Sequence, residues 1–213
     1  MHHGHDNHEG GVAHEIEWAG WYEQFGSKTD VSFQNMQLGN DGKIHGGGKD
    51  PNGEFAIHGH LSGNEVKFDK AYKGAHTVNY SGKLDHGVIS GKWSLTGMEG
   101  TFEIKMKTKQ WKGHFTHGGS NFDMLVSLQL NEFKTVDTRL TGLGSDAHGN
   151  YSLHGFRPRN HPETVHFKKQ YFGQNSAVHY AGVIGNINGH ETIKGVWMLP
   201  SGDNGTFELV KQL

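Results

Sequence analysis

The chain contains one sequence pattern twice, and this repeat limits what it can fold into. Residues 46–82 include GGGKDPNGEFAIHG, VKFDKAYKG and VNYSG, and residues 142–182 include GLGSDAHGNYSLHG, VHFKKQYFG and VHYAG. A repeated pattern of this length indicates a repeated folding unit. We therefore expect a His- and Gly-rich tail at residues 1–16 and two units, at residues 17–107 and 108–213, each of ordinary domain size.

Within each copy apolar and polar residues alternate, as in β-strands that bury one face. Short connections with turn residues, such as Asn40-Asp41-Gly42, leave no room for crossover helices, so the strands should pair antiparallel. Eight such strands can close into a barrel without free edges. The sequence thus predicts an all-β fold of two tandem eight-stranded antiparallel up-and-down β-barrels. In the first copy we expect strands near residues 17–24, 30–39, 42–46, 53–61, 64–71, 75–83, 87–96 and 99–106.

Three local features complete this picture. Gly46-Gly47-Gly48 lies between two expected strands and is expected to form a turn. It is not expected to hold a phosphate, because no helix N-terminus follows it. Asp50 and Asp146 occupy the same place in the two copies and are expected to cap turns with their side chains. The join at residues 107–110 is short, so the two units should pack against each other.

Composition narrows the functional classes. The chain has no cysteine, a formal net charge of −2, and no apolar run long enough for a signal peptide or a membrane span. We expect a soluble, cytoplasmic protein that binds neither nucleic acid nor membrane. The G-x-S-x-G, G-x-x-x-x-G-K and H-E-x-x-H motifs are missing, which favours a protein that is not an enzyme.

The 18 histidines suggest two places for a metal ion, although no cofactor is required by the rest of the sequence. Met1, His2 and His3 could chelate Cu²⁺ or Ni²⁺ through the terminal amine, two amides and an imidazole, a tetragonal nitrogen set that suits these metals. The alternative is a solvated terminus.

The second place is the outer wall of the second unit. His154, His166 and His179 fall at outward phases of three successive strands. Turns centred near residues 160 and 172–173 would place them side by side, with Cβ atoms about 4.5–5.5 Å apart. Such a row could bind Zn²⁺ or Cu²⁺. The alternative is three histidines that face solvent.

The first unit contains the segment Gly20-Trp21-Tyr22-Glu23-Gln24-Phe25-Gly26-Ser27, followed later by residues 66–68, 77–82 and 89–95. These segments are similar to the first strand and loop and to the fifth to seventh strands of the avidin–streptavidin family, so the first unit resembles that family. The resemblance implies a ligand inside the barrel. Glu23 departs from the family's ureido-binding Asn, so biotin itself is not the expected ligand. The candidate ligand-binding residues are Trp21, Tyr22, Ser27, Phe68, Tyr80 and Trp93.

Three hypotheses about function follow. The first is a non-enzymatic binding protein that takes a small apolar or aromatic ligand in a lumen, or a partner protein on its wall. The second is a structural subunit of an assembly, including a homo-oligomer. The third is an enzyme that uses a histidine-bound metal.

Overall fold

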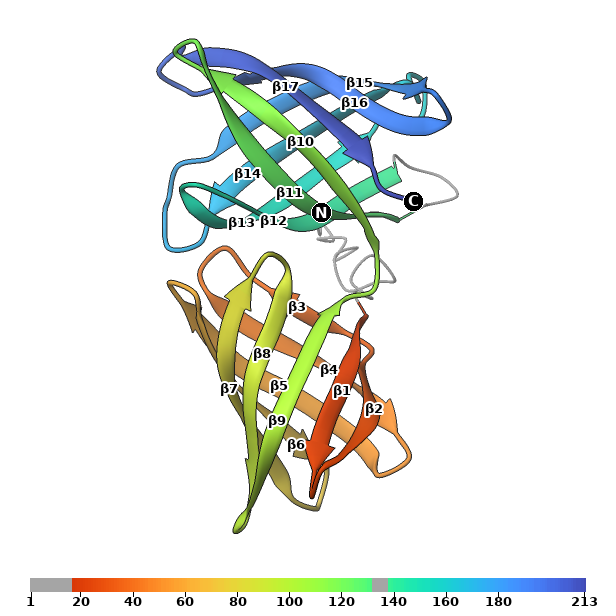
Figure 1. Cartoon of the computed structure of the whole chain (residues 1–213), viewed down its shortest axis with the longest axis vertical. Coiled ribbons are helices and arrows are strands. Elements are labelled where there is room, and N and C mark those ends of the chain that lie inside the picture. The colour runs from red at the N-terminus through yellow and green to blue at the C-terminus, as the bar shows by residue number, and fades with distance from the viewer. Residues whose placement is uncertain (1–16, 132–137) are drawn as a thin grey trace, which may run out of the picture.

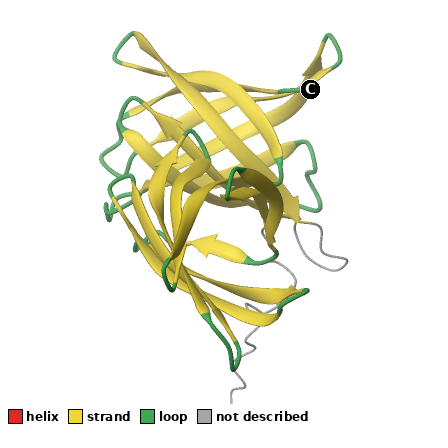
Figure 2. Cartoon of the chain, turned by 60° about the horizontal axis from the view of Figure 1, so that its bottom comes forward, coloured by secondary structure: helices red, strands yellow, loops and turns green. Residues whose placement is uncertain are grey.

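The computed structural model describes residues 17–131 and 138–213, and within them every regular element is a β-strand (Figure 2). The first nine strands form one curled antiparallel sheet, and the last eight form a closed antiparallel barrel. Figure 1 shows the two units one above the other, with β9 leading directly into β10. The all-β prediction is confirmed, and a closed eight-stranded barrel is confirmed for the second unit.

The first unit is a nine-stranded sheet with the order β2-β1-β9-β8-β7-β6-β5-β4-β3. Its two edge strands, β2 and β3, are consecutive in the chain. The strands are β1 (Trp18–Gln24), β2 (Ser27–Phe33), β3 (Met36–Leu38), β4 (Lys43–Asp50), β5 (Gly53–Ser62), β6 (Glu65–Tyr72), β7 (Thr77–Asp85), β8 (Val88–Leu95) and β9 (Met98–Met106).

The single strand predicted at residues 30–39 was wrong, because the chain bends at residues 34–35 and divides it into β2 and β3. Phe33 and Met36 are both fully buried. Side chains of a regular strand alternate between the two faces, so two residues three positions apart cannot both point inward without such a bend.

The predicted turn at Gly46–Gly48 was also wrong, since these glycines lie inside β4. Gly47 N–H donates to the carbonyl oxygen of Asn35 at 2.9 Å. A Cβ at Gly46 would collide with the same oxygen. Glycine is therefore needed here so that β4 can pass close to the bend between β2 and β3.

The second unit closes because its second strand is unbroken. β11 runs for 12 residues and pairs with β10 along one edge and with β12 along the other. The strands are β10 (Lys109–His117), β11 (Ser120–Asn131), β12 (Thr138–Asp146), β13 (Gly149–Arg157), β14 (Thr164–Tyr171), β15 (Val178–Ile187), β16 (His190–Met198) and β17 (Asn204–Lys211).

The two units pack against each other, as predicted from the short join. One end of the first unit lies on the β12–β13 wall of the second. Leu143 of this wall belongs to the buried apolar cluster of the first unit. Asn150 Nδ2 donates to the carbonyl oxygen of Leu84 at 3.0 Å, and Ser152 Oγ is hydrogen-bonded to Asn40 Oδ1.

Candidate ligand-binding site

Among the described residues, each unit buries one lysine within its apolar core. Lys70 on β6 is 3% exposed and Lys169 on β14 is 1% exposed. The strand alternation turns them inward, because each lies two residues after a buried phenylalanine, Phe68 or Phe167. A buried ammonium must be paired to be tolerated.

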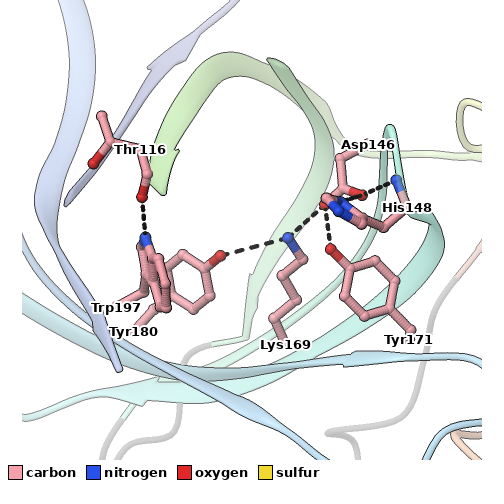
Figure 3. Close-up of polar contacts among 7 residues, drawn as sticks. All are labelled: Thr116, Asp146, His148, Lys169, Tyr171, Tyr180 and Trp197. Carbon is pink, nitrogen blue, oxygen red and sulfur yellow. Dashed lines mark hydrogen bonds and ion pairs between the residues drawn. The ribbon is translucent and has the colours of Figure 1, made fainter. Parts of the chain in front are cut away.

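In both units the lysine is paired with an aspartate that lies directly before the turn of the preceding β-hairpin. Lys70 Nζ lies 2.8 Å from Asp50 Oδ2, and Lys169 Nζ lies 2.5 Å from Asp146 Oδ2 (Figure 3). The same Oδ2 atoms accept hydrogen bonds at 2.6 Å from the hydroxyls of Tyr72 and Tyr171. We refer to these two sets as the Lys–Asp–Tyr clusters.

The second carboxylate oxygen holds the turn. Asp50 Oδ1 accepts from the backbone N–H of Asn52 at 2.8 Å, and Asp146 Oδ1 accepts from that of His148 at 2.8 Å. The prediction that both aspartates cap turns is therefore confirmed. Each carboxylate links a β-hairpin to the interior of its unit.

Aromatic rings surround the two ammonium groups. Lys70 Nζ lies 4.3 Å from the ring centre of Phe55, and Lys169 Nζ lies 4.4 Å from that of Tyr151, the equivalent residue. Lys169 also donates to the hydroxyl oxygen of Tyr180 at 3.4 Å. Cation–π contacts at these distances stabilise a desolvated cation.

The clusters change the pKa values of their members. Burial favours a higher pKa for Asp50, but the hydrogen bonds from Lys70, Tyr72 and Asn52 and the charge of Lys70 outweigh it and hold the pKa of that carboxyl below its usual value. Burial lowers the pKa of Lys169, although the Asp146 carboxylate opposes the change.

Burial also raises the pKa of the hydroxyls of Tyr80 and Tyr180 above the usual value for tyrosine. Both phenols therefore stay neutral at physiological pH and can act as hydrogen-bond donors or acceptors.

In the first unit the Lys–Asp–Tyr cluster borders a cavity of about 550 Å³. Its lining combines the inward aromatic residues with polar groups of β2 and the β4–β5 turn. The lining includes Tyr22, Thr29, Asp30, Ser32, Gln34, Asp50, Asn52, Lys70, Tyr72, His76, Val78, Tyr80, Trp93 and Leu95. The side chain of Asp50 is 21% exposed here.

In the second unit three rings fill the corresponding space. Phe115 and Phe122 are stacked with ring centres 5.1 Å apart, and the His148 ring lies 5.6 Å from Phe122 and 6.2 Å from Tyr171. The side chain of Asp146 is 0% exposed as a result. We refer to Phe115, Phe122 and His148 as the aromatic plug.

The first unit has smaller or more polar residues at the plug positions. The β1–β2 register pairs Tyr22 with Thr29, as the β10–β11 register pairs Phe115 with Phe122. Asn52 follows Asp50 by two residues, as His148 follows Asp146. Each unit thus has an equivalent Lys–Asp–Tyr cluster, and the two units differ in whether the space beside the cluster is filled.

Three of the six predicted ligand residues, Tyr22, Tyr80 and Trp93, line this cavity. Tyr22 and Trp93 meet edge to face with ring centres 6.0 Å apart. Trp93 is oriented by its Nε1–H, which donates to the carbonyl oxygen of Glu23 at 3.0 Å.

The structure places the other three away from the cavity lining. Trp21 is on the outer face of β1, where the Lys28 ammonium lies 3.9 Å from its ring centre. Ser27 is exposed at the start of β2. Phe68 is in the core, stacked on Tyr80 at 4.7 Å.

The predicted row of three histidines on the second unit was wrong in register. His154, His166 and His179 are exposed on the outer wall, as expected, but His154 lies opposite Lys168, and Lys168 lies opposite His179. His166 lies opposite Phe156 and Ala181. Within residues 17–131 and 138–213 no group of three or more His, Asp or Glu side chains could hold a metal ion. Met1, His2 and His3 lie outside the described residues.

The Lys–Asp–Tyr clusters were missed at the sequence level, although the repeat contains their signal. Lys70-x-Tyr72 and Lys169-x-Tyr171 occupy the same inward phase in the two copies, each downstream of an equivalent aspartate. A charged residue at an inward phase in both copies indicates a buried, paired group.

The closed barrel has a second hollow of about 540 Å³, at the end away from the plug. Trp111, Leu140 and Ile184 contribute apolar surface, and Lys109 and Lys211 contribute charge. Lys211 is paired with Glu191 at 3.1 Å.

Comparison of the sequence with models of known protein families and with curated proteins gave no match. In the part of the chain that the structure describes, no helix has the length and apolar character needed to cross a membrane.

Proposed function

We propose that the first unit binds a small molecule that combines a flat apolar face with a hydrogen-bond donor. The observation that carries this proposal is the difference between the two units. The second copy fills the space beside its Lys–Asp–Tyr cluster with three rings, whereas the first copy keeps about 550 Å³ beside an equivalent cluster. This volume lies in the range of ligand sites.

The lining supports this class of ligand. Tyr22, Trp93, Val78 and Leu95 offer aromatic and aliphatic faces, and rings favour stacked or edge-to-face contacts with another ring. An avidin-like ligand position inside the first unit is in keeping with this lining, and we regard that unit as a barrel that is open only between β2 and β3.

Asp50 is the group that would orient the ligand. A carboxylate has about four acceptor positions, and protein donors occupy three of them: Lys70, Tyr72 and the Asn52 N–H. The fourth can accept from a ligand N–H or O–H. Because Lys70 already balances the charge of Asp50, a neutral donor fits the site better than a cation.

A fluorescence titration with N-phenyl-1-naphthylamine tests the proposal, because this dye has two flat ring systems and one N–H donor. Thr29→Phe combined with Asn52→His transplants two plug residues into the first unit. We expect this double variant to bind the dye at least tenfold more weakly than the unmodified chain.

Thr101→Phe is the matched control. It adds the same ring at an exposed position on the outer face of β9, so dye binding should not change. If the folded double variant binds the dye as tightly as the unmodified chain, the first cavity is not the binding site.

A further inference from the structure

The outer wall of the second barrel carries a groove of about 290 Å³ that is separate from the cavity in the first unit. Eight side chains on the outer faces of β13, β14, β15 and β16 surround it. These are His154, Phe156, His166, Lys168, His179, Ala181, Val196 and Met198.

One lateral row across the groove is basic. The register places His154 opposite Lys168 and Lys168 opposite His179. Directly opposed side chains on neighbouring strands have Cβ atoms about 4.5–5.5 Å apart, so these three groups can surround one anion. None of the described residues that line the groove is acidic.

The neighbouring row is aromatic and apolar. The Phe156 ring stacks on the His166 ring with centres 5.3 Å apart and an interplanar angle of 21°. Val196 continues this row beyond Ala181, and Met198 ends the basic row. Phe156, Val196 and Met198 are 44%, 52% and 53% exposed. Large apolar side chains gathered at one exposed place mark an interaction site.

The two rows are separated by the distance between alternate residues of a strand, about 7 Å. A ligand that spans them carries an anionic group and an aromatic ring at roughly this separation. From this we infer that the groove binds a phosphate monoester bearing an aromatic ring, such as a free nucleoside monophosphate, with the phosphate at Lys168 and the ring on Phe156.

The corresponding wall of the first unit does not have these features. There one row consists of His58, Asp69, Asn79 and Ser94. The neighbouring row consists of His60, Lys67, Ser81 and Lys92. Asp69 stands where the second unit has Lys168, and His60 stands where it has Phe156. The first unit therefore supplies natural substitutions for a test.

Isothermal titration calorimetry with AMP, adenosine and inorganic phosphate on the whole chain tests the inference. AMP is expected to bind at least tenfold more tightly than either of the other two. Lys168→Asp should weaken AMP at least tenfold. Phe156→His should weaken AMP but leave inorganic phosphate unchanged. Both positions are exposed, so circular dichroism should show an unchanged fold.

Lys92→Asp, on the wall of the first unit, is the control and should leave AMP binding unchanged. The inference is overturned if AMP binds no more tightly than phosphate, or if Lys168→Asp has no effect. It is also overturned if Thr29→Phe with Asn52→His abolishes AMP binding, because AMP would then occupy the first cavity. Loss of dye binding without loss of AMP binding in that variant keeps the two sites distinct.

Discussion

At the scale of residues, Lys169 and Asp146 depend on each other because both are out of contact with water. The side chains of Lys169 and Asp146 are 1% and 0% exposed, and Lys169 Nζ lies 2.5 Å from Asp146 Oδ2. Removing one member of a buried pair leaves an uncompensated charge, whereas replacing the whole pair by apolar or neutral groups is often tolerated.

Asp146→Asn is therefore expected to lower the free energy of unfolding by about 3–5 kcal/mol. Adding Lys169→Met should restore most of this loss, since the unpaired ammonium is then gone. Urea unfolding of the two variants measures the difference. A double variant less stable than Asp146→Asn would contradict this account of the cluster.

The contacts of Asp50 make the free energy of unfolding depend on pH in the acid range. Its pKa in the folded chain lies below the usual value, so the stability it contributes is present above the unfolded pKa of about 3.9 and is lost as the pH falls through the folded pKa. The difference in unfolding free energy between the unmodified chain and Asp50→Asn should therefore be largest near pH 7 and shrink below about pH 4. Urea unfolding at pH 7 and pH 3 measures it; a difference that does not change with pH would rule out this linkage.

At the scale of elements, one extra residue explains why the first sheet does not close as the second does. Trp18 and Trp111 are offset by 93 positions, and Met36 and Leu128 by 92, so the first copy has one more residue between its buried positions. Two residues separate Phe33 from Met36, whereas Ser127 alone separates Val126 from Leu128. The extra residue bends the strand and leaves β2 and β3 as edges.

The aromatic plug is formed by residues near the ends of β10 and β11 and in the β12–β13 turn. Phe122→Thr combined with His148→Asn gives β11 and the β12–β13 turn the residues of the first unit. We expect this variant to gain a binding site for N-phenyl-1-naphthylamine beside Lys169, seen as a new perturbation of the Trp197 indole signal by NMR. Phe115 remains in place, so the barrel should still fold. A folded variant whose Trp197 signal ignores the dye would show that these two rings are not what closes the space.

Strand positions could be predicted because, in both copies, every second residue of a strand is an inward-facing one. The register of β13 and β14 could not. The pairing of His154 with Lys168 centres the connection on residue 161, one position beyond the predicted centre, and this moves the partner by two residues. The histidines kept their outward face, since a shift of two preserves it, but Lys168 took the place expected for His166. The break at residues 34–35 and the filling of one lumen depend on tertiary packing, which alternation does not describe.

At the scale of the whole molecule, the two units form one body through the β12–β13 wall. Leu143 is 6% exposed and belongs to the buried cluster of the first unit, and Asn150 reaches the Leu84 carbonyl from the same wall. This contact covers the end of the first unit that lies away from the cavity, so the mouth beside Asp50 remains available to a ligand.

Leu143→Glu places a charge in this interface and should separate the units while each keeps its own core. Small-angle X-ray scattering is expected to show a larger radius of gyration, and the dye should still bind the first cavity. An unchanged radius of gyration would mean that the interface does not depend on Leu143.

Two equivalent tryptophans, followed in one spectrum, show directly whether a ligand enters the first unit and not the second. Trp93 Nε1–H donates to Glu23 O at 3.0 Å beside the cavity, and Trp197 Nε1–H donates to Thr116 O at 2.9 Å in the plugged unit (Figure 3). The chain has five tryptophans, so their indole N–H signals can be followed individually by ¹⁵N–¹H NMR during a titration with N-phenyl-1-naphthylamine. The expected result is a shift of the Trp93 signal without a shift of the Trp197 signal. Equal shifts of both signals, or no shift of the Trp93 signal under conditions where the dye binds, would contradict it.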